Sequence, residues 1–210
     1  MKNTTTNSNR HFPLFQSHID LAHSYWKRLL SVGDIAVDAT CGNGHDTLLL
    51  AETVLTETSG TVYAFDVQAQ AIQATRERAE AKLGVISQRI ITLQQSHETF
   101  PEEFASMEIK LFIYNLGYLP GADKSKTTET GSTLRSIQQA CALVTPGGAI
   151  SVTCYPGHPE GALEEKALLE YAESLCKETW EVCHHRWSNR SKAPSLLLLL
   201  LNAKTRSSES

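Results

Sequence analysis

Short apolar runs alternate with longer amphipathic segments, and this alternation restricts the possible folds more than any other feature of the sequence. The runs of strand length are 35–39, 61–66, 89–93, 109–114, 149–154, 180–187 and 195–202. The first five are separated by segments with helical spacing, whereas the last two follow each other directly. Strands separated by helices pair in parallel, because the chain crosses back over the sheet between them. The pattern predicts a doubly wound α/β fold: a seven-stranded, mostly parallel sheet with one antiparallel strand and helices on both faces.

The segments between the strand runs carry helix signals. The expected helices cover residues 46–55, 69–83, 101–107, 132–144 and 163–176. An N-terminal helix is also expected, whose His18 and His23 either pack in the core or cover a ligand. Gly84 stops the helix at 69–83, and Ser132 can cap the one that follows the long loop from Leu116 to Gly131. A loop of that length indicates a functional segment rather than a simple connection.

The length of 210 residues suits one domain with a sizeable core. We expect a single domain over residues 18–203, with a flexible N-terminal segment at 1–17 and a flexible tail at 204–210. Apolar residues make up 41% of the chain and charged residues 20%, which is typical of globular proteins. The longest apolar run, 196–201, is far shorter than the roughly 20 residues of a membrane-spanning helix, so no membrane association is expected.

The five cysteines are widely spaced and include no C-x-x-C pair, which argues against a disulfide framework and a structural zinc site. We therefore expect a cytoplasmic, reducing location and no metal site. The first 19 residues contain no acid, which leaves an organelle-targeting segment open. The formal net charge of -4 gives no overall positive field, so binding of a nucleic acid would need a local basic face.

A glycine-rich turn follows the first strand run. Gly42 and Gly44 lack side chains that would keep a ligand away from the backbone at a helix N-terminus. Asp66 ends the second strand run, where it can accept both ribose hydroxyls of an adenosine. Because ligands of doubly wound sheets bind at the carboxyl ends of the strands, these residues predict a site for an adenosine-containing cofactor.

Two residues near this turn discriminate between cofactors. Thr47 stands where a dinucleotide fingerprint needs Gly or Ala. Asp38 would repel a pyrophosphate but can engage a cationic or zwitterionic methionine group. Both residues favour S-adenosylmethionine. The alternative is that Asp38 only caps the turn backbone.

Asn115 directly follows the fourth strand run, beside the expected position of the reactive methyl. Its carbonyl can accept an N–H of a substrate amine or amide and aim the nitrogen lone pair at that methyl. Methyl transfer from a sulfonium needs an aligned, neutral nucleophile more than it needs a strong base. Tyr118, in the loop that follows, can form an aromatic wall. Asn115 and Tyr118 are the expected catalytic residues.

Several other polar residues could contact a ligand or have an ordinary structural role. His97 and His158 follow strand runs and either contact a ligand or are ordinary surface side chains. Cys41 has no assignable His and acid partners, so nucleophilic catalysis by its thiol is not expected. His184 and His185 alternate between the faces of a strand and are therefore not expected to share a metal.

Five motifs together resemble a known family. They are Asp38-Ala-Thr-Cys-Gly-Asn-Gly-His-Asp-Thr47, Phe65-Asp-Val-Gln68, Ser96-His-Glu98, Asn115-Leu-Gly-Tyr-Leu-Pro-Gly-Ala-Asp-Lys124 and Tyr155-Pro-Gly-His158. In order and spacing they are similar to small S-adenosylmethionine-dependent methyltransferases labelled rRNA methylases, from about His18 to Asn202. The family usually has Gly-Gly-Asp-Lys where this chain has Gly121-Ala-Asp-Lys124, a difference that keeps the acid and the base.

The resemblance implies a Rossmann-like class I methyltransferase fold with S-adenosylmethionine as cofactor. It also implies an activity on tRNA. Members of the family methylate the 5-aminomethyl group of (2-thio)uridine at wobble position 34, which gives 5-methylaminomethyl-(2-thio)uridine. The implied partner is the anticodon stem-loop of a tRNA.

The resemblance and the strand-end pattern together give the candidate site. The cofactor is expected at Asp38, Gly42, Asn43, Gly44, Asp46, Thr47, Asp66, Gln68 and His97. The resemblance puts Asp66 and Gln68 near the ribose and His97 near the adenine. The substrate, besides Asn115 and Tyr118, is expected at Leu116, Gly117, Asp123, Lys124, Tyr155 and His158.

A basic face for tRNA can be assembled from a few cations at the carboxyl ends of the strands. They are Lys124, Lys126, Arg186, Arg190 and Lys192, and the alternative is that they are solvated surface charges. An anticodon base can stack on Tyr118, Tyr155 or Trp187, and the sequence does not choose among them.

Other functions remain open. Methylation of rRNA or of a small-molecule amine would use the same site. A nucleotide-dependent oxidoreductase is opposed by Thr47, and a non-catalytic RNA-binding module is opposed by the Asn115-Leu-Gly-Tyr118 motif. The sequence leaves open whether the protein is a homodimer, which tRNA species it uses and whether 2-thiolation is required.

Overall fold

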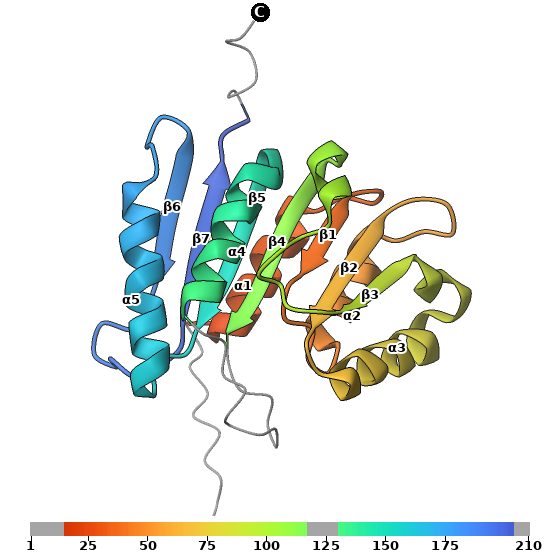
Figure 1. Ribbon diagram of the computed structural model, residues 1–210, viewed down its shortest axis with the longest axis horizontal. Helices are drawn as coiled ribbons and strands as arrows, with labels where there is room; N and C mark the ends of the chain where they lie inside the picture. The colour runs from red at the N-terminus through yellow and green to blue at the C-terminus, as the bar shows by residue number, and fades with distance from the viewer. Residues whose placement is uncertain (1–14, 117–129, 204–210) are drawn as a thin grey trace, which may run out of the picture.

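Seven strands form one sheet within residues 15–116 and 130–203, the part of the chain that this computed structural model describes (Figure 1). The strands are β1 (Ile35–Asp38), β2 (Thr61–Asp66), β3 (Ile90–Gln94), β4 (Ile109–Leu116), β5 (Val144–Cys154), β6 (Trp180–His185) and β7 (Ser195–Leu201). The helices are α1 (His18–Leu29), α2 (His45–Val54), α3 (Ala69–Leu83), α4 (Thr130–Leu143) and α5 (Pro159–Ser174), with short 3-10 helices η1 (Gly84–Arg89) and η2 (Glu102–Ser106).

The strand order across the sheet is β3-β2-β1-β4-β5-β7-β6 (Figure 1). The five strands from β3 to β5 are parallel, and β7 runs antiparallel to both of its neighbours, β5 and β6. This arrangement confirms the doubly wound, Rossmann-like fold. The order reverses between β1 and β4, and ligands of such sheets bind at this switch point, beyond the carboxyl ends of the strands.

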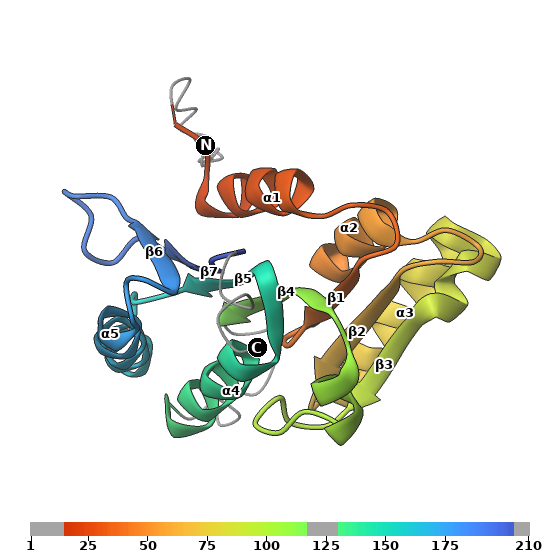
Figure 2. The same ribbon diagram turned by 90° about the horizontal axis from the view of Figure 1, so that it is seen from above.

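Two apolar layers lie on the two faces of the sheet. Alternate residues of a strand contribute to different layers, because successive side chains point to opposite faces. Ala36 lies in the layer that Trp26 of α1 and Leu50 of α2 complete. Val37 lies in the other layer, with Ile137 of α4 and Leu168 of α5. Helices therefore cover both faces of the sheet (Figure 2). Among the described residues, no helix has the length and apolar character needed to cross a bilayer.

The structure moves three strand boundaries by two residues or more. β6 ends at His185 instead of residue 187. β4 continues to Leu116 instead of ending at residue 114, because Asn115 pairs with Thr153 of β5. β5 begins at Val144 instead of residue 149, because Val144 pairs with Ile109 of β4 and a register shift follows. The Pro-Gly-Gly sequence expected to separate helix from strand thus lies within β5.

Three helical segments also differ from expectation. α4 begins at Thr130 instead of residue 132, so Ser132 lies inside its first turn and is not its cap. α5 begins at Pro159 rather than at residue 163, because proline fits a first helical turn and His158 caps it. The segment expected as a short α-helix at 101–107 is the 3-10 helix η2, and η1 follows α3 where only a stop at Gly84 was expected.

Candidate active site

The turn between β1 and α2 packs tightly against its surroundings. Gly42 and Gly44 have φ angles of 49° and 76°, in the left-handed region that glycine adopts without strain. A Cβ atom on Gly44 would lie 2.8 Å from the Cα of Thr75 on α3, so this contact also requires glycine. The Cys41 N–H donates to the Phe65 carbonyl at 2.8 Å and ties the turn to the end of β2. These contacts preform the turn, and we call residues 41–44 the glycine cradle.

Asp66, the last residue of β2, is held by two backbone amides. The Gly42 N–H donates to its Oδ2 at 3.1 Å and the Gln68 N–H to its Oδ1 at 2.9 Å. A carboxylate oxygen accepts more than one hydrogen bond, so Asp66 keeps capacity for ligand hydroxyls. The structure thus brings together Gly42, Asp66 and Gln68, three residues predicted at the cofactor.

Asp38 lies beneath this turn and is only 1% exposed. It accepts hydrogen bonds from Thr47 Oγ1 at 2.6 Å and from the Thr40 N–H at 3.1 Å. Burial, together with the nearby charge of Asp46, raises the pKa of Asp38 to about 7. Thr47 is equally buried, and its side chain contacts the turn only indirectly, by donating to Asp38. Engagement of a methionine group by Asp38 stays a prediction.

Asn115 is fixed at both its main chain and its side chain. Its N–H donates to Thr40 Oγ1 at 2.7 Å, and its Nδ2 donates to Asp46 Oδ2 at 3.2 Å. His23 Nε2 donates to the other oxygen of Asp46, Oδ1, at 2.8 Å. Because Nδ2 points at Asp46, Oδ1 is the acceptor that Asn115 can offer to a substrate.

Tyr155 follows β5 directly and interacts with Asn115. Burial is the main reason why the pKa of its phenol rises to about 12; the charge of Asp46 adds to the rise, and the hydrogen bond with Asn115 opposes it. The Tyr155 hydroxyl lies 3.3 Å from His18 Nε2, and the two rings meet edge to face at 5.5 Å. Tyr155 is therefore a neutral phenol at physiological pH, with a hydroxyl and an aromatic ring beside Asn115.

The two histidines predicted at the site have different surroundings. His97 is buried, its ring meets that of Tyr114 at 5.7 Å, and its Nδ1 has no hydrogen-bond partner among the described residues. Burial lowers the pKa of His97 to about 4, so the ring is neutral. His158 instead caps α5, where its Nδ1 accepts from the Gly161 N–H at 3.0 Å. Substrate contact by His158 stays a prediction.

The remaining predicted residues are distributed as follows. Leu116 is buried at the end of β4, and exposed Asn43 accepts at its carbonyl from Arg78 Nε at 2.7 Å. Four residues predicted at the substrate lie outside the described residues: Gly117, Tyr118, Asp123 and Lys124.

Three residues at this site were not among the predicted site residues. Thr40 anchors both Asp38 and Asn115, and no feature of its sequence position suggested this. The other two are His18 and His23, for which the sequence allowed two roles: packing in the core or covering the ligand. Their hydrogen bonds to Tyr155 and Asp46 place both at the rim of the site, which supports the second reading.

The loop between β6 and β7, residues 186–194, lies at the same edge of the sheet, because β6 is antiparallel to β7 and therefore runs in the direction of β5. A Cβ on Gly157 would lie 3.6 Å from the Lys192 carbonyl, so the loop approaches the segment after Tyr155. The Arg190 guanidinium lies 5.1 Å from the Trp187 ring centre, and the Phe15 ring meets Trp187 edge to face at 5.6 Å. We call residues 186–194 the basic hairpin loop. Lys126, the other expected cation besides Lys124, lies outside the described residues.

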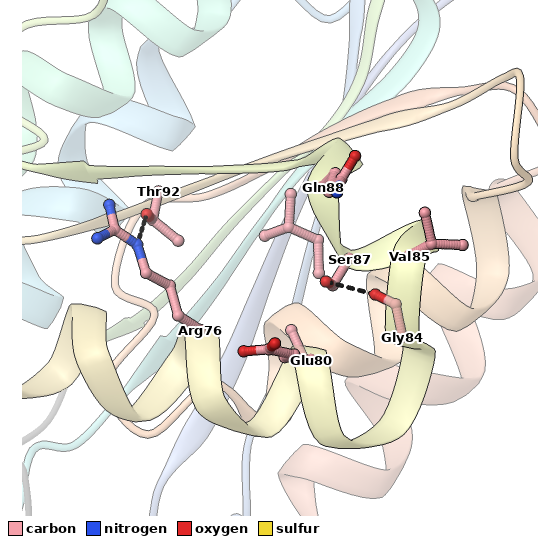
Figure 3. Close-up of a pocket in the computed structure, with 9 residues that line it drawn as sticks. Arg76, Glu80, Gly84, Val85, Ser87, Gln88 and Thr92 are labelled. Atoms are coloured by element: carbon pink, nitrogen blue, oxygen red, sulfur yellow. Dashed lines mark hydrogen bonds between the residues drawn. The ribbon is translucent and has the colours of Figure 1, made fainter.

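A separate hollow of about 540 Å³ lies between α3, η1 and β3 (Figure 3). Arg76 Nε donates to Thr92 Oγ1 at 2.6 Å across it, and Ser87 Oγ donates to the Gly84 carbonyl at 2.6 Å. None of the predicted site residues lines it. The chemistry-bearing residues therefore gather at the carboxyl edge and not in this hollow.

The residues at the carboxyl edge fit S-adenosylmethionine. The glycine cradle lies beside Asp66, whose carboxylate can accept hydrogen bonds from ribose hydroxyls. The His97 Nδ1, which has no partner among the described residues, offers a buried polar atom. The carboxyl groups of Asp46 and Asp66 lie near Asp38 at this turn, and their negative charge suits a cationic sulfonium.

Residues 62–201 match the model of the family described as putative rRNA methylase. The chain belongs to this family. Its members transfer methyl groups from S-adenosylmethionine, and the chain is accordingly an S-adenosylmethionine-dependent methyltransferase, as the sequence predicted. The matched range begins in β2 and thus excludes α1, β1 and α2.

Similar proteins agree with the family. The tRNA (mnm(5)s(2)U34)-methyltransferase, chloroplastic, of Arabidopsis thaliana is 33% identical over 188 residues, which are 86% of this chain and 68% of the relative. A putative rRNA methylase from Clostridium thermocellum aligns with a TM-score of 0.82 and 30% identity over 89% of this chain and 98% of its own. A putative methyltransferase from Streptococcus mutans, solved in complex with SAH, aligns with a TM-score of 0.77 and 29% identity. The alignment covers 90% of this chain and 99% of that protein's chain.

Proposed function

We propose that this methyltransferase converts 5-aminomethyl-(2-thio)uridine at tRNA position 34 to 5-methylaminomethyl-(2-thio)uridine. The orientation of Asn115 at the switch point carries the proposal. Thr40 holds its main chain and Asp46 holds its Nδ2, so Oδ1 can accept one N–H of a primary amine. With that N–H held, the nitrogen lone pair can be aimed at a methyl group bound beside the glycine cradle.

The protein's own residues position the amine and keep its surroundings polar. S-adenosylmethionine, when bound, supplies a methyl group on a positively charged sulfur. An alkylamine is protonated in neutral water and must lose a proton to become a nucleophile, and that proton can leave to solvent. Asn115 Oδ1 and the Tyr155 hydroxyl are two fixed polar atoms for the amine. Their hydrogen bonds are already formed in the folded protein, so little reorganisation is needed when the substrate binds.

Two observations support tRNA as the substrate. The relative from Arabidopsis thaliana is named as a methyltransferase of position 34 in tRNA. The basic hairpin loop approaches the site and carries Arg186, Trp187, Arg190 and Lys192. Anticodon bases are presented in a loop, where they can stack on aromatic side chains while cations contact phosphates.

The test is mass spectrometry of nucleosides from tRNA that carries 5-aminomethyluridine, after incubation with purified protein and S-adenosylmethionine. We expect one added methyl at the aminomethyl nitrogen. Asn115→Ala should lose most of this activity while it still binds S-adenosylmethionine in calorimetry. Asn202→Ala is the matched control, because Asn202 follows β7 at the opposite edge of the sheet and should keep full activity.

A wild-type protein that binds the cofactor but leaves this tRNA unmethylated would contradict the proposal. The same assay with rRNA and with small amines would then identify the nucleophile. The 2-thio requirement follows from comparing tRNA with and without the thio group.

Location and assembly are part of the proposal. We propose a cytoplasmic enzyme, and since the Arabidopsis thaliana relative is named chloroplastic, imaging of the tagged full chain decides between the two. We propose a homodimer, which analytical ultracentrifugation tests directly. The single domain over residues 18–203 is also proposed, and limited proteolysis should leave that span intact.

A further inference from the structure

Three residues from three separate elements form one hydrogen-bonded chain at the site. His23 of α1 donates from Nε2 to Asp46 Oδ1 at 2.8 Å, and Asp46, in the first turn of α2, accepts at Oδ2 from Asn115 Nδ2 at 3.2 Å. A carboxylate only accepts hydrogen bonds, so the proton lies on His23 Nε2. Each oxygen of Asp46 thus has a different partner, one from α1 and one from β4.

The chain is shielded from water. The His23 side chain is 26% exposed and the Asp46 side chain 14% exposed. The Trp26 ring, itself buried, lies 5.0 Å from the His23 ring and restricts its rotation. A shielded, charge-assisted hydrogen bond is stronger than an exposed one, so the imidazole holds the Asp46 carboxylate in one rotamer.

Asp46 and Tyr155 both bond the Asn115 amide, and Asp46 is the partner that accepts only from Nδ2, because it is a carboxylate. An amide can be flipped with little change in shape, and only its partners fix which end is the donor. With Asp46 in place, Nδ2 faces the carboxylate and Oδ1 faces away from it. If Asp46 turned away, Nδ2 would lose this partner and the amide could present a donor where the substrate amine needs an acceptor.

We propose that His23 is a positioning residue for the methyl transfer, which acts through Asp46 to keep the Asn115 carbonyl directed at the substrate amine. The proposal rests on the proposed function for the identity of that amine. Its structural part, the coupling of His23 to Asn115, stands apart from the substrate. The range matched by the family model begins after both His23 and Asp46, so the family match does not assign this role.

Two substitutions of His23 distinguish a positioning role in the site from a role that only stabilises helix α1. His23→Leu removes the donor, whereas His23→Gln keeps an N–H near the position of Nε2. Tyr25→Phe is the matched control, because Tyr25 lies on the same helix and its hydroxyl bonds His185 of β6 at 3.1 Å, away from Asp46. If His23→Leu does not fold, Asp46→Asn takes its place, since it breaks the same chain from α2.

The first measurement needs neither cofactor nor substrate. The side-chain NH2 of Asn115 gives a pair of peaks in a proton–nitrogen correlation spectrum, assigned by their loss in Asn115→Ala. We expect these peaks to move in His23→Leu and to stay near their wild-type positions in His23→Gln and Tyr25→Phe. Unmoved peaks in a folded His23→Leu protein would overturn the proposal.

The second measurement is the kinetics of methyl transfer. We expect kcat to fall by roughly 10-fold to 100-fold in His23→Leu, with the KM for S-adenosylmethionine unchanged, and to recover in His23→Gln. A His23→Gln variant as slow as His23→Leu would overturn the positioning role. If the wild type does not methylate 5-aminomethyluridine at all, the proposed function fails, and the spectra still decide whether His23 sets the Asn115 amide.

Discussion

At the scale of single residues, Asp38 is a carboxyl group whose surroundings disfavour its charge. Its carboxyl has a raised pKa of about 7 in the folded protein, because it is buried beside Asp46. The folded state therefore holds a proton that the unfolded chain releases near pH 4. From about pH 4 to about pH 7 this group lowers the free energy of unfolding as pH rises, and above that range the loss is complete.

We expect Asp38→Asn to remove this part of the pH dependence, because an amide does not ionise and Thr47 can still bond to it. Urea unfolding of both proteins between pH 5 and pH 8 measures it. The variant should gain stability relative to the wild type as pH rises, by at most a few kcal/mol (about 1.4 kcal/mol for each unit of pKa difference). Parallel curves for the two proteins would contradict the assignment.

At the scale of elements, α1 serves the core and the site at once. Trp26, 3% exposed, packs in the layer that α1 and α2 build on the sheet, while His18 and His23 of the same helix reach the site. Trp26→Ala would leave a large cavity there. We expect it to lower the free energy of unfolding by about 3 to 5 kcal/mol, measured by urea denaturation.

The matched control is Trp187→Ala. Trp187 lies in the basic hairpin loop and is only half-buried, so the same substitution should cost far less stability. Equal losses in the two variants would mean that α1 contributes little to the core. Because the core and the site share α1, Trp26→Ala should also weaken the His23 to Asp46 contact.

At the scale of the whole molecule, charge is distributed unevenly. The formal net charge is -4, yet the basic hairpin loop at the carboxyl edge carries exposed Arg186, Arg190 and Lys192. If tRNA binds at this edge, neutralised phosphates release counterions and affinity falls with salt. We expect Arg190→Ala to weaken tRNA binding and to lower the slope of log affinity against log salt by about 1, measured by filter binding.

Lys177→Ala is the matched control for this prediction. Lys177 precedes β6 at the opposite, amino edge of the sheet, and its side chain is 90% exposed. Its loss should leave both affinity and salt slope unchanged. Equal effects of the two substitutions would indicate nonspecific attraction instead of a defined face for tRNA.

The sequence by itself determined the order of strands and helices along the chain, the parallel character of the sheet and the strand ends that carry the candidate site. These follow from local signals: apolar periodicity along short runs, and glycines such as Gly44 that the turn requires. It also predicted the family, because its motifs lie on those strand ends. Element boundaries moved where pairing across the sheet overrode local preference, as with Val144 and Asn115.

Tertiary structure alone decided which side chains meet. Residues 23, 46 and 115 are far apart along the chain, and no local pattern relates them. Their contact depends on β4 lying beside β1 and on α1 packing with α2 in one apolar layer against the sheet. The same holds for Asp38, whose burial and raised pKa come from the packing of the turn over it. Periodicity specifies which face of an element is buried, whereas hydrogen-bond partners are specified only when the elements pack.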